Sequence, residues 1–313
     1  MGSIASRCIA VVFAVCSMPG IAAPAEGAAA AAVPIRDGSL STSDGAQIHY
    51  LEAGQATAAP ALVLIPGWTL SASLWQTQLR LFSATRLVLA VDSRSQGESS
   101  KTLYGNTPER RASDLHELMA SRHIGRFVIV GWSQGAQDVA AYIRQFGTVS
   151  LAGVVFVDSP VSAGPAEVEL HPAFSKLILS GLSVYADHPA EYSEGMVRSI
   201  FARPHPELDL QHLIDEARKT PPQTGITMLL MDLFGVDRRD ALNKIDRPAL
   251  VIAAASSPFL PQQKEMAAAI AGARLVVVEE AGHALFIDQP QQFDQALAQL
   301  LQAADAAGSG IAG

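Results

Sequence analysis

The chain has 313 residues, of which 49% are hydrophobic and 17% are charged. This composition provides a sizeable buried core and excludes a largely disordered chain. A net charge of −8 without any block of Lys or Arg argues against nucleic acid as a partner. Both cysteines, Cys8 and Cys16, lie near the start, so a chain cleaved after them would have neither a disulfide nor a metal site built on sulfur.

Residues 1–25 have the pattern of a secretory signal peptide. Arg7 precedes an apolar run at Cys8–Val15, and small residues follow at 22–25. The run is shorter than the ~20 residues that a membrane-spanning helix needs, so we expect no stable membrane insertion after cleavage. Residues 26–35 are expected to form a flexible linker. The mature protein is expected to be secreted or periplasmic.

Strand-like and helix-like stretches alternate along the rest of the chain. Residues 38–42 and 47–52 can pair as a hairpin across the turn sequence Ser43-Asp44-Gly45. Continuous apolar runs follow at 61–65, 86–91, 127–130, 154–157, 249–253 and 275–278. Such runs are typical of strands that are buried on both faces of a parallel sheet. Helical stretches lie between or after them at 108–121, 136–146, 262–271 and 291–303. This order predicts an α/β fold with a mostly parallel, doubly wound sheet.

One gap in this alternation is too long for an ordinary connection. Residues 160–246 separate two core segments, 36–159 and 247–303, and they are rich in Pro, His and short apolar clusters. We expect this segment to form a helical cap over the carboxyl ends of the strands, where open α/β sheets bind ligands. Residues 304–313 are expected to form a disordered tail.

Ser133 is the candidate nucleophile. The apolar run 127–130 leads directly into Gly131-Trp132-Ser133-Gln134-Gly135, and a helix with apolar positions on one face follows. A strand, a Gly-x-Ser-x-Gly turn and a helix together form a nucleophile elbow, whose tight turn exposes the serine. The alternative is an ordinary strand-to-helix turn in which Ser133 only caps the helix.

A serine hydroxyl needs a base to remove its proton, and His283 is the candidate base. Of the eight histidines, it alone follows a predicted core strand. It therefore lies at the same edge of the sheet as Ser133, and Gly282 before it allows the loop to bend. The alternative is a loop histidine without a catalytic role.

Taken together, these features resemble the α/β-hydrolase family over roughly residues 36–303. Residues 92–99 (Asp-Ser-Arg-Ser-Gln-Gly-Glu-Ser) resemble the family's Asp-x-x-Gly-x-Gly-x-Ser turn, and residues 282–290 resemble its histidine segment. The family also places an oxyanion donor after the strand that precedes the first helix. The resemblance therefore implies that the backbone N–H of Trp68 is one donor and that the N–H of Gln134 is the other.

The resemblance leaves the acid of the triad open. In the family's commonest pattern the strand after the cap ends in Gly-Asp-x-Asp-x-x-Pro, but here Ser257 occupies the acid's place and no carboxylate follows before Glu265. Some members carry the acid one strand earlier, where this chain has Asp158, the candidate acid for orienting His283. The alternative is a dyad in which Ser257 hydrogen-bonds His283. Asp288, on the same loop as the histidine, is less favoured.

A serine nucleophile indicates acyl transfer through a covalent intermediate, so hydrolysis of carboxylic esters is the expected function. Lactone opening and perhydrolysis use the same apparatus and stay open. Trp68, Trp132 and an apolar cap favour a small hydrophobic substrate. Nothing in the sequence calls for a metal or organic cofactor, and the oligomeric state is not predicted. A non-catalytic ligand-binding homologue is the alternative from another class, because fold alone does not determine function.

Overall fold

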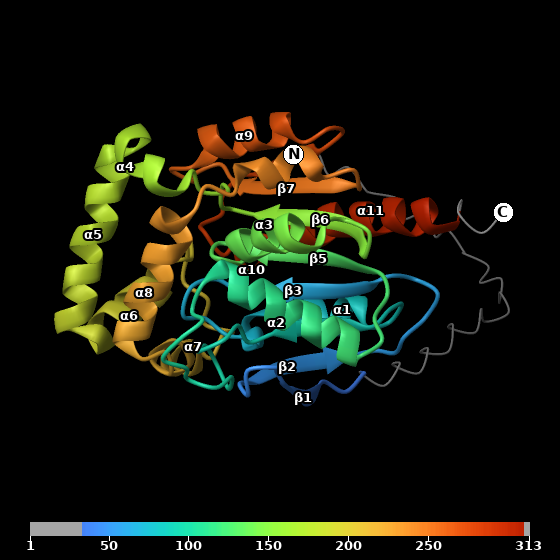
Figure 1. The fold of residues 1–313 in the computed structure, drawn as a ribbon, viewed down its shortest axis with the longest axis horizontal. Helices are drawn as coiled ribbons and strands as arrows, with labels where there is room; N and C mark the ends of the chain where they lie inside the picture. The colour runs from blue at the N-terminus through green and yellow to red at the C-terminus, as the bar shows by residue number, and fades with distance from the viewer. Residues whose placement is uncertain (1–32, 310–313) are drawn as a thin grey trace, which may run out of the picture. The chain divides into compact units, whose positions relative to one another are not determined.

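The computed structural model describes residues 33–309, and within this range eight strands form a single sheet (Figure 1). The strands are β1 (Arg36–Ser41), β2 (Gln47–Ala53), β3 (Ala61–Ile65), β4 (Val88–Val91), β5 (Phe127–Trp132), β6 (Leu151–Val157), β7 (Ala249–Ala254) and β8 (Arg274–Val278). Their order across the sheet is β1-β2-β4-β3-β5-β6-β7-β8. The β1–β2 and β2–β4 pairs are antiparallel, and every other neighbouring pair is parallel. The predicted hairpin and the mostly parallel sheet are confirmed.

The central strands are buried on both faces, which explains their uninterrupted apolar sequences. In β3, Leu62 and Leu64 pack into one hydrophobic cluster, whereas Val63 and Ile65 pack into the other. Successive side chains of a strand point to opposite faces, so a strand between two cores needs an apolar residue at every position.

Helices cover both faces of this sheet. Buried residues of α2 (Pro108–Ser121), α3 (Gly135–Phe146) and α9 (Leu260–Ala269) belong to one cluster. Those of α1 (Gln76–Phe82), α10 (Leu285–Asp288) and α11 (Pro290–Ser309) belong to the other. The sheet is therefore doubly wound, as predicted.

The long segment between β6 and β7 is helical, as its sequence predicts. It contains α4 (Glu167–Leu170), α5 (Pro172–Asp187), α6 (Pro189–Ser199), α7 (Leu210–Arg218), α8 (Pro222–Leu230) and the π-helix η3 (Met231–Gly235). Figure 1 shows α4 to α8 gathered at one end of the sheet. An antiparallel bridge between Ala163 and Asp237 joins the two ends of this cap.

Both ends of the described range, residues 33–309, differ from the predictions. Helix α11 continues to Ser309, so residues 304–309 are helical and not part of a disordered tail. The reason is that Ala304 is fully buried in the core and that alanine has the highest helix propensity. At the other end, Val33 and Ile35 pack against the core, so the last residues of the predicted linker are attached to the domain.

The predicted signal peptide and the predicted linker up to residue 32 lie outside the described residues. Within residues 33–309, no helix combines the length and the hydrophobicity that crossing a membrane requires.

Candidate active site

Ser133 lies on a strained turn between β5 and α3. Its φ is 56°, in the left-handed region that residues with a Cβ rarely adopt. A Cβ on Gly131 would approach the Gly135 carbonyl oxygen to 2.3 Å, and one on Gly135 would approach the Ile65 oxygen to 2.8 Å. Both glycines are therefore required by close backbone approach. The Ser133 N–H donates to the Val157 carbonyl at 3.1 Å, which ties the turn to the neighbouring strand β6.

Asp158 and His283 are in direct contact. The distance from His283 Nδ1 to Asp158 Oδ2 is 2.8 Å, and the Asp158 side chain is only 3% exposed, compared with 32% for His283. The other carboxylate oxygen, Oδ1, accepts from the Ala254 N–H at 3.0 Å and from Gln263 Nε2 at 3.3 Å. These bonds hold the carboxylate in the orientation in which it faces the histidine ring.

Ser257 does not take the place of the acid. Its hydroxyl oxygen accepts from Gln263 Nε2 at 3.1 Å and from the Phe259 N–H at 3.4 Å, and among residues 33–309 it makes no hydrogen bond with His283. The predicted alternative in which Ser257 bonds to His283 is therefore wrong for this structure. Gln263, which the sequence analysis missed, is fully buried and joins Ser257 to Asp158.

Side chains of neighbouring residues hold the loop that carries His283 through hydrogen bonds to its backbone. Trp132 Nε1 donates to the His283 carbonyl at 2.8 Å, and Asp288 Oδ2 accepts from the Gly282 N–H at 2.7 Å. The other oxygen of Asp288 lies 2.7 Å from His205 Nε2 in the cap. Asp288 thus supports the histidine loop. Trp132, which was expected near the nucleophile, lies beside His283 but is fully buried beneath this loop and is not among the residues that line the cavity described below.

The residues predicted to form the oxyanion hole face the same cavity as Ser133. Trp68 and Gln134 both line it, and neither backbone N–H donates to an acceptor within the described part of the chain. Trp68 also reaches the cap, because its indole Nε1 donates to the Gly225 carbonyl at 2.8 Å. The arrangement leaves two backbone donors available beside the serine.

A cavity of about 770 Å³ brings the predicted site residues together. Its lining includes Trp68, Ser133, Gln134, Asp158 and His283. No hydrogen bond joins Ser133 to His283 among residues 33–309, although such bonds often tighten only when a ligand is bound. No group of three or more His, Cys, Asp or Glu side chains in this range is arranged to hold a metal ion.

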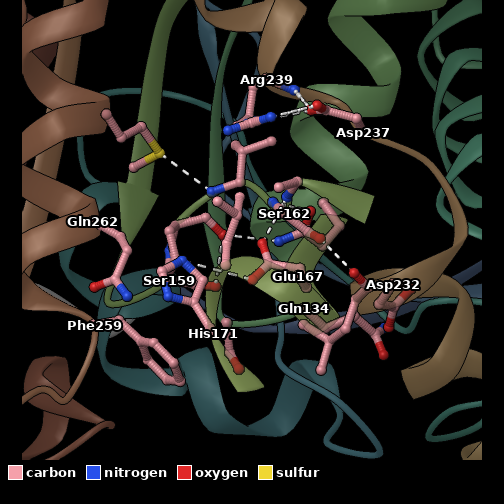
Figure 2. A pocket seen from close by; sticks show the side chains of 18 of the residues that line it. Gln134, Ser159, Ser162, Glu167, His171, Asp232, Asp237, Arg239, Phe259 and Gln262 are labelled. Carbon is pink, nitrogen blue, oxygen red and sulfur yellow. Dashed lines mark hydrogen bonds and ion pairs between the residues drawn. The ribbon is translucent and has the colours of Figure 1, made fainter. Parts of the chain in front are cut away.

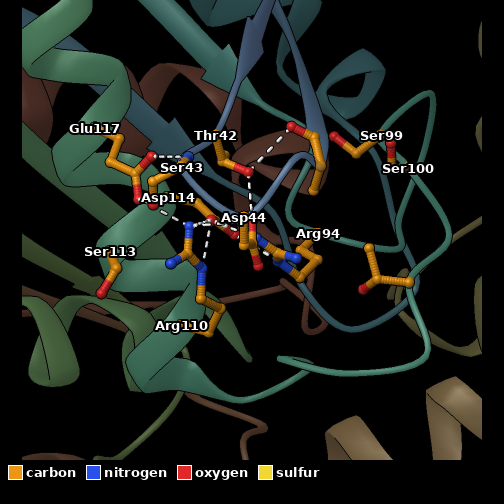
Figure 3. A network of polar contacts seen from close by, with 12 residues as sticks. Thr42, Ser43, Asp44, Arg94, Ser99, Ser100, Arg110, Ser113, Asp114 and Glu117 are labelled. Carbon is orange, nitrogen blue, oxygen red and sulfur yellow. Dashed lines mark hydrogen bonds and ion pairs between the residues drawn. The ribbon is translucent and has the colours of Figure 1, made fainter.

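The cavity wall is partly apolar and partly charged. Figure 2 shows Phe259 and Gln262 on one side and Asp232 on the other. Cap residues complete the apolar part, among them Phe174, whose ring meets that of Phe259 edge to face at 4.7 Å between centroids. Arg239, at the polar end, pairs with Asp237 at 2.6 Å. The cavity wall therefore combines the apolar cap residues that the sequence indicates with charged residues that it does not.

A buried ion cluster joins the cap to the core beside this cavity. Arg111 of α2 lies 2.7 Å from an oxygen of Asp138 in α3 and 2.5 Å from an oxygen of Asp232 in the cap. Burial raises the pKa of Asp138, and burial raises the pKa of Asp232 to about 7. The second oxygen of Asp232 is buried without a hydrogen-bond partner.

Known proteins share this architecture. A model of the alpha/beta hydrolase family matches residues 62–296. The chain is similar to a putative non-heme chloroperoxidase of Synechocystis, with 26% identity over 271 residues that cover 82% of this chain and 95% of the relative. It is also similar to a pimeloyl-[acyl-carrier protein] methyl ester esterase of Nitrosomonas europaea, with 24% identity over 252 residues that cover 79% of this chain and 97% of the relative.

A solved structure has the same fold. The crystal structure of a bromoperoxidase from Bacillus anthracis matches with a TM-score of 0.76 and 25% identity, covering 85% of this chain and all of that protein. The family model covers far more than half of the sequence, and its span contains the elbow, the cap and the histidine loop. The chain therefore belongs to the alpha/beta hydrolase family.

Proposed function

We propose that this protein hydrolyses carboxylic esters through a covalent acyl-enzyme formed on Ser133. The observation that carries the proposal is the 2.8 Å contact between Asp158 and His283 at the cavity that Ser133 faces. A nucleophile, a base and an acid that orients the base are the parts that serine hydrolases need. The similarity to a methyl ester esterase supports ester cleavage as the reaction.

In the proposed mechanism, His283 acts through its Nε2 atom, because Nδ1 is held by Asp158. Nε2 takes the proton of the Ser133 hydroxyl while Oγ attacks the ester carbonyl carbon. The negative charge that develops on the carbonyl oxygen is stabilised by the N–H groups of Trp68 and Gln134. Collapse of the tetrahedral intermediate breaks the C–O bond, and the departing alkoxide receives the proton from His283. Water, deprotonated by the same histidine, then releases the acid and restores the serine.

The cavity supports a small substrate with an apolar acyl or aryl group. Leu170, Phe174 and Ile178 of the cap and Met266 of the core line it. Contact with such side chains favours hydrophobic groups, whereas the polar and charged side chains of the wall can fix the orientation of the substrate.

Perhydrolysis is the second candidate, because the similar proteins include a putative chloroperoxidase and a bromoperoxidase. In that reaction hydrogen peroxide replaces water in the second step and yields a peracid. Lactone opening would use the same residues. Peracid formation and lactone hydrolysis, each measured beside p-nitrophenyl ester hydrolysis with the same enzyme preparation, rank the three activities.

A serine-reactive organophosphonate tests the proposal directly. We expect stoichiometric labelling at Ser133 and, in parallel, hydrolysis of short-chain p-nitrophenyl esters that Ser133→Ala abolishes. Folded protein that neither reacts with the phosphonate nor turns over any ester of the panel would instead support a non-catalytic ligand-binding homologue.

We further propose export to the periplasm or the medium, with cleavage of the signal peptide. The proposal is supported by the small residues after the apolar run of the leader. N-terminal sequencing of exported protein is expected to begin between Ala23 and Ala28. Exported material that still begins at Met1 would overturn it.

A further inference from the structure

We propose that Gln96 is a positioning residue that holds the two oxyanion donors in place relative to each other. The inference rests on the proposed function, since it assigns a role within that same site. Gln96 lies in the turn after β4 and is fully buried. The family motif in this turn did not identify its side chain as part of the site.

The amide nitrogen of Gln96 reaches the loop that presents Trp68. Nε2 donates to the Gly67 carbonyl at 2.8 Å and to the Leu70 carbonyl at 2.5 Å. These two carbonyls stand on either side of Trp68 in the sequence, so both of the amide's protons are used to hold that loop.

The amide oxygen of Gln96 reaches the nucleophile elbow. Oε1 accepts from Gln134 Nε2 at 2.7 Å, and the Gln134 side-chain oxygen itself is buried without a partner. Gln96 is therefore the hydrogen-bonding partner of the Gln134 side chain. One planar amide connects the two segments whose backbone N–H groups are the proposed donors.

Both segments need such a support. Thr69 has a φ of 60° and Ser133 one of 56°, so each donor lies next to a residue with a strained backbone. Inside the loop between β3 and η1 (Ala72–Trp75), the Leu70 N–H donates to the Gly67 carbonyl at 3.2 Å. An oxyanion donor is effective only about 2.7–3.1 Å from the developing charge, so a small shift of either segment weakens catalysis.

Gln96 is itself rigidly held. Its N–H donates to the Ser93 carbonyl at 2.8 Å, and its own carbonyl accepts from the Ser99 N–H at 3.0 Å and from Lys101 Nζ at 3.2 Å. Gln96 can hold the two neighbouring segments only if its own backbone is held in place, and these three hydrogen bonds hold it.

The test is Gln96→Glu, compared with wild type and with Gln78→Leu. The glutamate keeps the size of the side chain and an acceptor toward Gln134, but it replaces the amide donor that faces two carbonyls. We expect kcat for a p-nitrophenyl ester, per site titrated with phosphonate, to fall roughly 10- to 100-fold while KM changes by less than about threefold. Binding of a trifluoromethyl ketone, whose adduct carries an oxyanion, should weaken in parallel.

Gln78→Leu is the matched control. Gln78 is also fully buried and makes one side-chain bond, to Asp294 at 3.0 Å, but it does not line the cavity. Its loss is expected to lower the melting temperature and to leave kcat per titrated site unchanged. If Gln96→Glu does not fold, Gln134→Met tests the other end of the support: it removes the bond from the Gln134 side chain to Gln96 Oε1 and is expected to lower kcat several-fold.

The outcomes separate the two proposals. Wild-type protein that hydrolyses esters, with folded Gln96→Glu or Gln134→Met variants that keep the wild-type kcat and ketone affinity, overturns the role of Gln96 alone. Wild-type protein without ester turnover or phosphonate labelling overturns the proposed function and this inference with it. A fall in kcat that Gln78→Leu matches would reduce Gln96 to a purely structural residue.

Discussion

The edge of the sheet and the cap both line the cavity, but they are fixed in different ways. Ser133 and Asp158 directly follow strands, and their N–H groups donate to the carbonyls of Val157 and Ile252, at 3.1 and 2.8 Å. The strand ladder thus continues into both residues. The cap is joined to the core mainly by side chains, such as the Trp68 indole and Arg111. The sheet therefore holds the proposed nucleophile and acid, and the cap completes the cavity through side-chain contacts.

The side chains of the sheet are also more deeply buried than those of the cap. Strands β5, β6 and β7 are buried throughout, whereas the cap helix α5 leaves Leu177 69% exposed and Val184 50% exposed. Hydrophobic stabilisation is proportional to buried apolar area. The apolar side chains of the cap therefore contribute less to the free energy of unfolding than those of the sheet do. Changes in the sheet edge should therefore affect chemistry, and changes in the cap contacts should affect stability and substrate affinity.

The largest effect is expected from Ser133→Ala. Loss of the attacking oxygen should lower kcat/KM for esters by roughly 10⁴- to 10⁶-fold. The free energy of unfolding should change by less than about 0.5 kcal/mol, because the Ser133 hydroxyl makes no hydrogen bond to the described residues 33–309. Ester kinetics and chemical denaturation of the same preparation check both statements. Turnover that survives in a folded variant would remove Ser133 from the mechanism.

The next effect concerns the acid. Asp158→Asn should lower kcat by about 10³- to 10⁴-fold, because an amide stabilises the wrong tautomer of His283. Ser257→Ala should change kcat less than about twofold and cost about 1 kcal/mol of stability, since Gln263 loses one bond. Melting curves of both variants must accompany the kinetics. The opposite pattern, with Ser257→Ala the damaging change, would restore the dyad.

Arg111→Leu should weaken the attachment of the cap. It leaves Asp138 and Asp232 buried without their cation, and removing one partner of a buried ion pair typically costs about 3–5 kcal/mol. Arg198→Leu is the control, because Arg198 is 54% exposed and its pair with Glu194 should contribute less than about 1 kcal/mol. Urea unfolding measures both. Equal losses in the two variants would contradict the importance of the buried cluster.

Asp232 should make stability depend on pH. Its raised pKa means that the folded state holds a proton that the unfolded chain releases, so this stabilisation is full below about pH 4 and is lost as pH rises through about 7. Asp232→Asn cannot ionise and should gain about 1–3 kcal/mol relative to wild type between pH 5 and pH 8. Measuring the free energy of unfolding at several pH values tests this. Asp215→Asn, on the surface of α7, is the control, because its difference in free energy from wild type should not change with pH. A constant difference for Asp232→Asn as well would contradict the assignment.

The smallest effect is expected from Trp68→Phe. The ring is largely kept, but the bond from the indole to the Gly225 carbonyl is lost, so KM should rise about two- to fivefold while kcat changes little. Trp132→Phe removes the equivalent bond beneath His283 and should lower kcat instead of raising KM. Steady-state kinetics of the pair compares cap with sheet edge directly, and identical changes in both variants would erase the distinction.

The sequence was sufficient for the parts of the molecule that have local signals. The apolar runs predict the parallel strands, and the Gly-x-Ser-x-Gly turn predicts the bend at Ser133. Asp158 follows its strand directly, which made it a candidate for contact with His283 although 125 positions separate them. These predictions succeed because the carboxyl ends of parallel strands must meet at one edge.

Contacts between polar side chains from distant segments have no such signal. Gln96 is 29 positions from Gly67, and Arg111 is 121 positions from Asp232. No periodicity or turn residue relates these pairs, because only the packed fold brings them together. The charged part of the pocket was missed for the same reason. The end of α11 was missed because an alanine-rich segment is compatible with both a linker and a helix, and only its packing distinguishes the two.

The cap enters and leaves the sheet at two neighbouring points. Strands β6 and β7 are direct neighbours, with Val157 paired to Ile252, and the bridge between Ala163 and Asp237 closes the base of the cap. The ends of the insertion are thus held together whatever lies between them, and the entropic cost of closing a longer insertion grows only slowly with its length. The pairing of β6 with β7 therefore does not require a particular length of the insertion. Recombination at these two points would change the cavity, and a new cap would have to keep the contacts with the histidine loop, such as His205 to Asp288 and the bond from the Ala284 N–H to the Ile200 carbonyl.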